Sequence, residues 1–169
     1  MPEDGSVDLY KALLRKAGAL LARRAYSRGE LRDRLSRYAG DAPLESVLTR
    51  LEELNLLNDE DYAYNFALCR IGQQGWGPAR VRKSLLQRQV PAATIEGALE
   101  RILNELDPAT VLREYVVKRC AKRPLPTDLK SIRRLILHLR RRGFDHNSIS
   151  NVLKELLPAA AWQRFETGE

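Results

Sequence analysis

The chain contains an internal repeat of about fifty residues, which restricts the possible folds more than any other feature of the sequence. Ser27 to Glu30 has the pattern of a helix capping box, and Tyr26 and Leu31 flank it as a hydrophobic staple. The same staple, N-cap and first helical position return fifty residues later at Trp76, Gly77, Pro78 and Val81. Two stretches of different composition therefore start a helix in the same way.

Apolar positions after each of these helices recur at i, i+3, i+4 and i+7, which is typical of one face of a helix. The three sets are Leu44, Val47, Leu48 and Leu51, then Ile95, Ala98, Leu99 and Ile102, then Ile149, Val152, Leu153 and Leu156. The third copy opens differently, with Lys130-Ser131 at the staple and Thr127 or Asp128 as the better cap. No stretch alternates with period two, so the sequence predicts an all-α protein.

Caps and periodicity together predict three tandem three-helix repeats, about nine helices in all. The expected helices are 8–25, 28–39, 43–55, 59–73, 78–88, 91–104, 108–122, 128–142 and 145–157, with Gly40 and Gly143 as C-caps. Residues 1–7 and about 158–169 are expected to be loose termini, with Trp162 and Phe165 able to form a short last turn. The repeats are 1–57, 58–106 and 107–169, and we expect them to stack into an elongated, curved array.

Several classes of protein are excluded by composition. No stretch approaches the roughly 20 apolar residues of a membrane-spanning helix, and the acidic N-terminus does not resemble a secretory signal. Cys69 and Cys120 lie in separate helical patterns, which predicts reduced, buried thiols and a cytoplasmic protein. His138 and His146 have no metal-ligand spacing, and Asp59 to Asp61 reads as helix N-terminal charge. We therefore expect no catalytic residue, no metal and no cofactor.

Charge is distributed unevenly along the chain, whose formal net charge is +7. The first two repeats are close to neutral, whereas the third carries 13 basic and 7 acidic residues. From Lys118 to Arg142 there are ten cations and one acid, Asp128. Some of these cations complement helix C-termini, but their number predicts a surface for phosphate or an acidic partner.

The candidate partner or DNA-binding surface combines this region with weaker basic stripes in the first two repeats, where ordinary solvated helix surface is an equally good interpretation. Its residues are Arg28, Arg32, Arg37, Arg80, Arg82, Lys83, Arg88, Lys130, Arg133, Arg134, Arg140, Arg141 and Arg142. Aromatic residues fall mostly at staple, core or turn positions, so the sequence does not predict a stacking platform for single strands.

A long central stretch resembles the bacterial RecX regulatory family. The opening LLARRAYSRGELRDRL and the segment LTRLEELNLLNDEDYAYNFALCRIGQQGWGPARVRKSLLQRQV carry its pattern. The matching positions of the centre are Leu51, Leu54, Leu57, Asp59, Glu60, Tyr62, Ala63, Phe66, Arg70, Gly77, Pro78, Val81, Arg82 and Leu85. The resemblance covers roughly residues 15–156. It departs at Gly40-Asp41, at Gln89-Val90 and at the start of the third repeat, which lacks Gly-Pro.

The resemblance implies a non-enzymatic, monomeric regulator that binds the RecA recombinase filament on DNA, lodges in its helical groove and restrains ATP hydrolysis and strand exchange in recombination and DNA repair. It supplies no catalytic residues. Two alternatives stay open from the residues alone. One is a freestanding double-stranded DNA-binding protein with helix-turn-helix-like units, and the other is a helical scaffold for an acidic protein partner.

Overall fold

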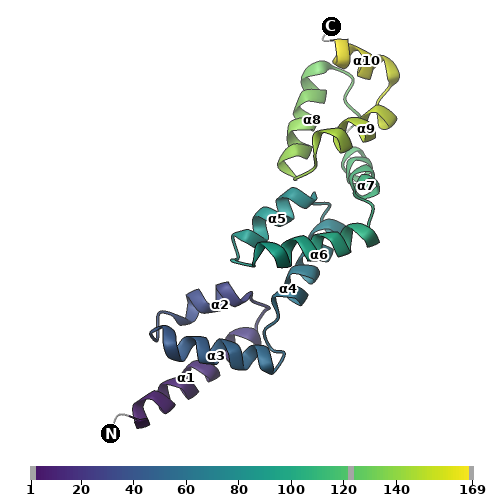
Figure 1. Ribbon diagram of the computed structural model, residues 1–169. Helices are drawn as coiled ribbons and strands as arrows, with labels where there is room; N and C mark the ends of the chain where they lie inside the picture. The colour runs from purple at the N-terminus through teal and green to yellow at the C-terminus, as the bar shows by residue number, and fades with distance from the viewer. Residues whose placement is uncertain (1–2, 122–123, 168–169) are drawn as a thin grey trace. The chain divides into compact units, whose positions relative to one another are not determined.

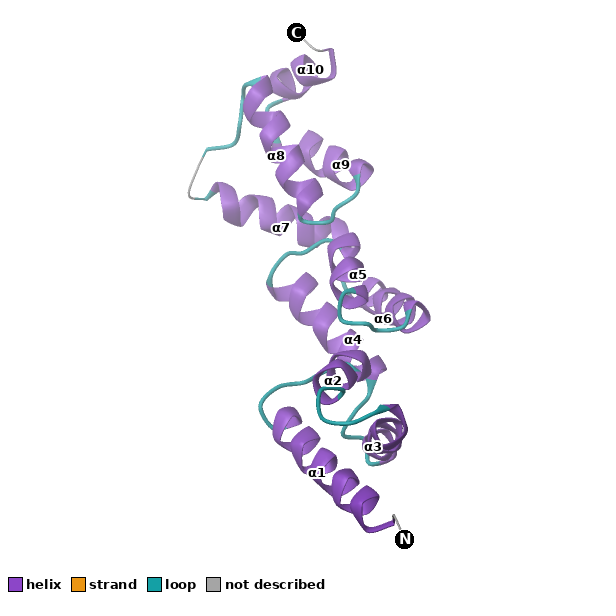
Figure 2. Cartoon of the chain, turned by 90° about the vertical axis from the view of Figure 1, so that its left-hand side faces the viewer, coloured by secondary structure: helices purple, strands orange, loops and turns teal. Residues whose placement is uncertain are grey.

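The structure is a computed structural model that describes residues 3–121 and 124–167. These residues form ten α-helices and one π-helical turn, and they contain no β-strand (Figures 1 and 2). The helices are α1 (Glu3–Leu21), α2 (Arg28–Leu35), α3 (Asp41–Glu53), α4 (Asp59–Leu68) with the π-helical turn η1 (Cys69–Gln73), α5 (Pro78–Leu86), α6 (Ala92–Glu105), α7 (Pro108–Cys120), α8 (Leu129–Arg141), α9 (His146–Leu156) and α10 (Ala159–Thr167). The all-α prediction is confirmed.

Helix starts follow the capping signals of the sequence. The Ser27 hydroxyl accepts from the Glu30 amide at 3.1 Å, while the Glu30 carboxylate accepts from the Ser27 amide at 3.4 Å, which completes the capping box. Pro78 opens α5, and Asp128 caps α8 by accepting from the Ser131 amide at 2.9 Å. Gly40 corrects one expectation, because α2 ends at Leu35 and Gly40 is the N-cap of α3 instead of a C-cap.

One compact unit of the chain comprises Met1–Tyr64 and Leu85–Ile95. In it, α1 packs against α2 and α3, and α2 packs against α3. Its core consists of apolar side chains that point between these helices: Leu13, Ala17, Tyr26, Leu31, Leu35, Leu44, Val47, Leu48, Leu51 and Leu57. The first apolar set of the repeat therefore faces the core, as its spacing predicts.

The other compact unit comprises Asn65–Ser84 and Glu96–Glu169. Here α9 packs against α7 and α8, and α10 packs against α8 and α9. The expectation of loose termini is wrong at both described ends: α1 starts at Glu3, and α10 occupies most of the presumed C-terminal tail. Trp162 is only 4% exposed and its ring lies 5.2 Å from that of the partly buried Phe165, so burial of Trp162 with Phe165 packed beside it holds α10 as a helix.

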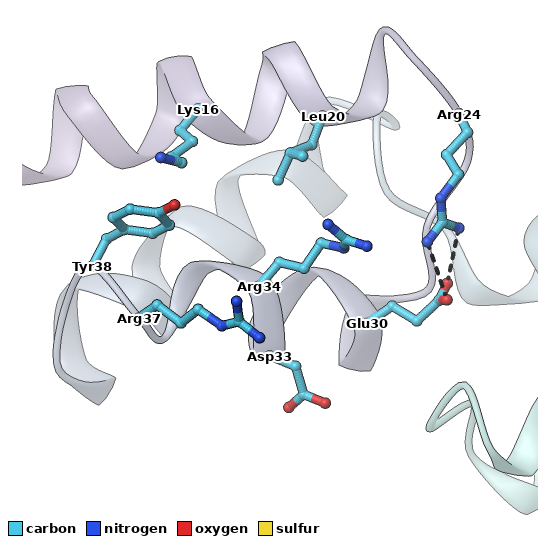
Figure 3. Close-up of a pocket in the computed structure, with 8 residues that line it drawn as sticks. All are labelled: Lys16, Leu20, Arg24, Glu30, Asp33, Arg34, Arg37 and Tyr38. Carbon is cyan, nitrogen blue, oxygen red and sulfur yellow. Dashed lines mark hydrogen bonds and ion pairs between the residues drawn. The ribbon is translucent and has the colours of Figure 1, made fainter.

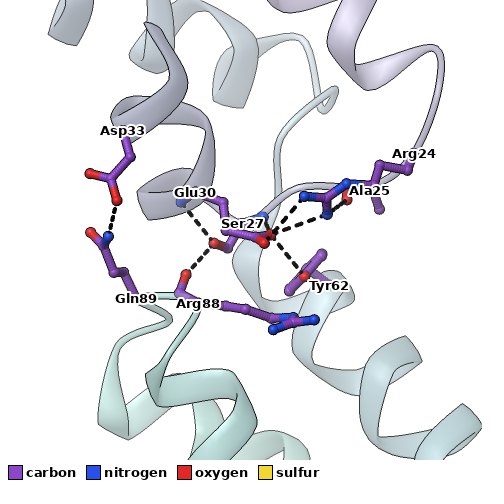
Figure 4. Close-up of polar contacts among 8 residues, drawn as sticks. All are labelled: Arg24, Ala25, Ser27, Glu30, Asp33, Tyr62, Arg88 and Gln89. Carbon is purple, nitrogen blue, oxygen red and sulfur yellow. Dashed lines mark hydrogen bonds and ion pairs between the residues drawn. The ribbon is translucent and has the colours of Figure 1, made fainter. Parts of the chain in front are cut away.

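Two turns accept equivalent hydrogen bonds from the starts of helices that are distant in sequence. In the first unit, the Ser27 hydroxyl at the N-cap of α2 donates to the Arg88 carbonyl in the turn after α5 (Figure 4). In the second unit, the Gly77 amide before α5 donates to the Arg142 carbonyl after α8, at 2.7 Å. Ser27 and Gly77 are equivalent positions of the repeat. Each of the first two repeats thus donates a hydrogen bond from the start of its middle helix.

Close backbone approach explains the glycines of the second turn. A Cβ on Gly77 would lie 2.2 Å from the carbonyl carbon of Gly143, and Gly143 has a φ of +91°, which disfavours other residues. The C-cap of α8 is Arg142, and Gly143 is the residue directly after it, where a glycine commonly ends a helix. The two cysteines are unpaired, as expected, but both are half-buried, so the expectation of buried thiols is wrong.

Candidate functional site

The solvent side of α8 carries five exposed cations, Lys130, Arg133, Arg134, Arg140 and Arg141, which we call the α8 basic face. At 100° per residue they fall within about one third of the helix circumference. The opposite side consists of Ile132, Leu135, Ile136 and Leu139, all buried in the core of the second unit. Burial of that apolar side fixes which way the cations point.

None of the five side chains forms an ion pair or hydrogen bond with a residue in 3–121 or 124–167. Leu137 lies in the middle of the face and is 50% exposed, although it is large and apolar. Exposed, unpaired cations around an exposed leucine form a surface that offers both charge and apolar contact to a partner.

Nearby arginines also affect the ionisation of His138, which lies on α8 beside the basic face. The pKa of His138 is lowered, first by burial and then by Arg119, Arg142 and other nearby arginines. The Tyr115 hydroxyl lies 2.8 Å from Nε2 of His138, which joins α7 to α8. Arg119 and Arg134 also line a hollow of about 400 Å³ between the end of α7, residues 124–128 and the start of α8.

Arg142 differs from the other expected site residues of the third repeat. Its half-buried guanidinium donates to the Gly75 carbonyl at 3.1 Å and to the Gln74 carbonyl, and it lies 4.2 Å from the centre of the Tyr115 ring. Burial is the largest cause that lowers its pKa. Arg142 thus holds the turn after η1 within the second unit.

Two of the three expected site cations of the first repeat are paired with neighbouring acids. Arg28 forms ion pairs with Glu45 at 2.7 Å and with Glu52 at 2.9 Å, and Arg32 contacts Glu45 at 3.0 Å. These ion pairs raise the pKa of Arg28, chiefly through the hydrogen bond to Glu45. Arg37 is exposed and lies in the turn after α2.

In the second repeat the expected site residues divide in the same way. Arg82 makes a bidentate contact with Glu96 at 2.6 and 2.7 Å. Arg80 stacks on Trp76, with its guanidinium carbon 3.9 Å from the ring centre. Lys83 is exposed, and the Arg88 side chain is half-buried. The structure therefore gathers exposed, unpaired charge on α8 and pairs much of the charge on α2 and α5.

One group of residues escaped the sequence analysis. Lys16 and Tyr38 face each other across a pocket between α1 and α2, with the Lys16 ammonium 3.4 Å from the ring centre (Figure 3). These two residues are far apart in sequence and share no motif. Only the packing of α1 on α2 brings them together, so no local signal was available.

Among the side chains that the structure describes, no group of three or more His, Cys, Asp or Glu could hold a metal ion. Within residues 3–121 and 124–167 no helix combines the length and apolar character needed to span a bilayer.

Known proteins match this chain over most of its length. The model for the second three-helix domain of RecX matches residues 58–99. A regulatory protein RecX of Prosthecochloris aestuarii is 37% identical over 153 residues, which are 89% of this chain and 96% of that protein. A regulatory protein RecX of Pseudomonas putida is 35% identical over 148 residues, which are 87% and 92% of the two chains.

A solved structure agrees with the fold. The crystal structure of RecX from Lactobacillus salivarius matches with a TM-score of 0.73 at 20% identity, and the match covers 89% of this chain and 97% of that one. Fold and surface thus define an all-helical repeat protein with an exposed basic helix. The chain belongs to the RecX family, whose matched members are named regulatory proteins. The resemblance identified from the sequence is confirmed.

Proposed function

We propose that this protein binds the RecA–DNA filament, in its helical groove, and restrains RecA ATP hydrolysis and strand exchange. Membership of the RecX family supports a regulatory role. The observation that carries the choice of surface is the α8 basic face, whose five cations have no acidic partner in residues 3–121 and 124–167. A filament on DNA offers phosphates and carboxylates to such a surface.

Thirteen cations are expected from the sequence to contact a partner, and those that are already paired with an acid are less available for this contact. Arg28, Arg32 and Arg82 already bind glutamates, so recruiting them to a partner would first break an ion pair. Arg142 is held by backbone carbonyls. We therefore assign the main contact to the α8 basic face, together with the exposed Lys83 of the same unit.

Leu137 favours a surface that contacts protein as well as phosphate. An exposed leucine gains nothing from a phosphate backbone, but burying the exposed half of Leu137 against an apolar side chain contributes about 0.8 to 1.5 kcal/mol. Surrounding cations would orient such a contact by charge complementarity. A RecA filament, which presents protein and DNA together, fits both requirements better than bare duplex does.

The test is RecA ATP hydrolysis on single-stranded DNA, measured against increasing amounts of this protein. The unmodified protein is expected to inhibit at stoichiometric amounts. The variant Arg133→Glu, Arg134→Glu, Arg140→Glu, Arg141→Glu should need at least about tenfold more protein, because four exposed charges at roughly 0.5 kcal/mol each exceed one decade. Reversal of Lys11, Arg15, Arg23 and Lys154, four exposed cations outside α8, is the matched control and should inhibit like the unmodified protein.

Different outcomes separate the proposal from its alternatives. Absence of inhibition by the unmodified protein would overturn the regulatory role on RecA. Inhibition that the α8 reversal leaves unchanged would overturn only the assigned surface. Tight binding to duplex DNA without RecA, with a steep dependence on salt, would favour the freestanding DNA-binding protein. Binding to an acidic protein without DNA would favour the scaffold.

A further inference from the structure

Within the first unit, the pocket between α1 and α2 gathers a second group of positive charges. It has a volume of about 410 Å³ and is lined from α1, α2 and the turns that follow them. Its lining residues are Lys16, Leu20, Arg24, Glu30, Asp33, Arg34, Arg37 and Tyr38 (Figure 3). Four of the eight side chains are cations and two are acids, so the site has an excess of positive charge.

Both acids of the pocket are already satisfied by other groups. The Glu30 carboxylate accepts from Arg24 at 3.3 Å and from the Tyr62 hydroxyl at 3.0 Å, in addition to the Ser27 amide (Figure 4). Asp33 accepts from the Gln89 side chain and points away from α1 in Figure 3. Glu30 is thus paired with Arg24, whereas Asp33 keeps its negative charge on the side of α2 that points away from α1.

The remaining cations are Lys16, Arg34 and Arg37, and none of the acids whose side chains the structure describes forms an ion pair with them. Figure 3 shows Arg34 and Lys16 extending into the space between α1 and α2, with Arg37 at its edge. Two guanidinium groups and one ammonium on a hollow of this size match the charge and donor geometry of phosphate oxygens.

Tyr38 adds a flat apolar surface beside these charges. It is 52% exposed and is the one exposed aromatic side chain in the described part of the chain. Lys16 lies over its ring and lowers the pKa of its hydroxyl by hydrogen bonding and charge. Proteins that bind single-stranded nucleic acids combine an exposed aromatic ring, on which a base stacks, with nearby cations, which bind the phosphates.

We propose that the α1–α2 pocket is a phosphate-binding site, in which Arg34, Arg37 and Lys16 hold the phosphoryl groups of single-stranded nucleic acid or of a free polyphosphate. Tyr38 distinguishes these two sources, because a base stacks on its ring and inorganic polyphosphate does not. The proposal does not rest on the role assigned to RecA, since the pocket lies in the first unit and its test contains no RecA.

The experiment titrates the full chain with two probes, inorganic pyrophosphate and a short oligothymidylate, and measures dissociation constants. Arg34→Gln with Arg37→Gln should weaken both probes about tenfold or more and reduce the salt slope of oligothymidylate binding by about two. Lys11→Gln with Arg15→Gln removes two exposed cations of α1 outside the pocket and should change neither constant. Tyr38→Ala should weaken oligothymidylate alone, by about fivefold or more, if nucleic acid is the ligand.

Chemical shifts of the backbone amides, measured by NMR on the unmodified protein, test the site without depending on whether a variant folds. Both probes should shift residues 16–20 and 34–38 together, in a saturable way. Equal weakening by the pocket pair and the control pair would overturn the proposal, as would shifts spread over all basic helices. Pyrophosphate binding that is lost in the pocket pair but unaffected in Tyr38→Ala, without oligothymidylate binding at the pocket, would support the site and assign it to free polyphosphate.

Discussion

Ser27 links the capping of α2 to the turn after α5, and its removal should destabilise the first unit more than loss of an ordinary helix cap. The side chain is fully buried and forms two hydrogen bonds: it accepts from the Glu30 amide and donates to the Arg88 carbonyl (Figure 4). Ser27→Ala removes both bonds at once. Ser27→Gly removes the same hydroxyl but keeps a residue that N-caps tolerate well.

The two bonds have separate magnitudes. Replacing an N-cap serine by alanine costs about 1 kcal/mol, whereas replacing it by glycine costs only a few tenths. Leaving the partly buried Arg88 carbonyl without a donor costs roughly 1 to 3 kcal/mol in either variant. We therefore expect Ser27→Ala to lower the free energy of unfolding by about 2 to 4 kcal/mol, and Ser27→Gly by about 1 to 3 kcal/mol.

Urea denaturation at 25 °C, followed by far-ultraviolet circular dichroism, measures both losses. Ser36→Ala is the matched control, because Ser36 is exposed and its hydroxyl donates only to the Asp33 carbonyl at 3.0 Å. Its loss should stay within about 0.5 kcal/mol. If Ser27→Ala also loses no more than about 0.5 kcal/mol, the buried bond to Arg88 does not stabilise the unit and the reasoning is refuted.

Three further predictions concern backbone packing, acid stability and shape. Gly77→Ala should lower the free energy of unfolding, measured by urea denaturation, by about 1 to 3 kcal/mol, because its Cβ would meet the Gly143 carbonyl. Gly97→Ala, in an open position inside α6, should raise it by roughly 0.5 to 1 kcal/mol. Equal effects of the two substitutions would contradict the close approach at Gly77. Burial alone would raise the pKa of Glu30, but hydrogen bonds from Arg24, Tyr62 and Ser27 outweigh burial and lower it. Its contribution to stability is therefore complete above the unfolded pKa of about 4.3 and is lost as pH falls through the lower folded value. In Glu30→Gln the free energy of unfolding, measured by urea denaturation, should fall less steeply between about pH 5 and 3 than in the unmodified protein. The same pH dependence in both proteins would contradict this prediction. Small-angle scattering should give a radius of gyration above the roughly 15 Å of a compact globule of this length, which would support the expected elongated array, and a value near 15 Å would contradict it.

The helices themselves were largely predictable because their signals are local. Capping residues such as Ser27, Pro78 and Asp128 act within one turn, and the apolar periodicity records which face is buried. The errors lie at positions where a distant contact decides. α10 forms because Trp162 packs onto the second unit, and the sequence indicated no more than a possible short turn there. Gly40 looks like a helix stop but starts the next helix.

The distribution of charge was predictable, but its pairing was not. Counting residues places the excess cations in the third repeat, and this is where the α8 basic face lies. Counting does not show that Arg28 binds Glu45 and Glu52, because these residues are 17 and 24 positions away. Nor does it show that Arg142, next to Arg141 in sequence, turns inward to the Gly75 carbonyl. Which cations remain available is decided by tertiary packing.

In the first two repeats the same hydrogen bond starts from equivalent positions, although the residues at those positions, Ser27 and Gly77, differ. At the N-cap of α2 a serine hydroxyl supplies the hydrogen bond to the turn after α5. At the equivalent position before α5, Gly77 has no side chain, and its own amide supplies the bond to the turn after α8. A side chain at Gly77 would collide with Gly143, so the closer backbone approach excludes the serine solution there. α8 begins differently, since Asp128 caps its own helix through Ser131 and no such bond is formed from its start in the described residues. The missing Gly-Pro of the third repeat therefore has a physical reason: that sequence serves a backbone contact that α8 does not make.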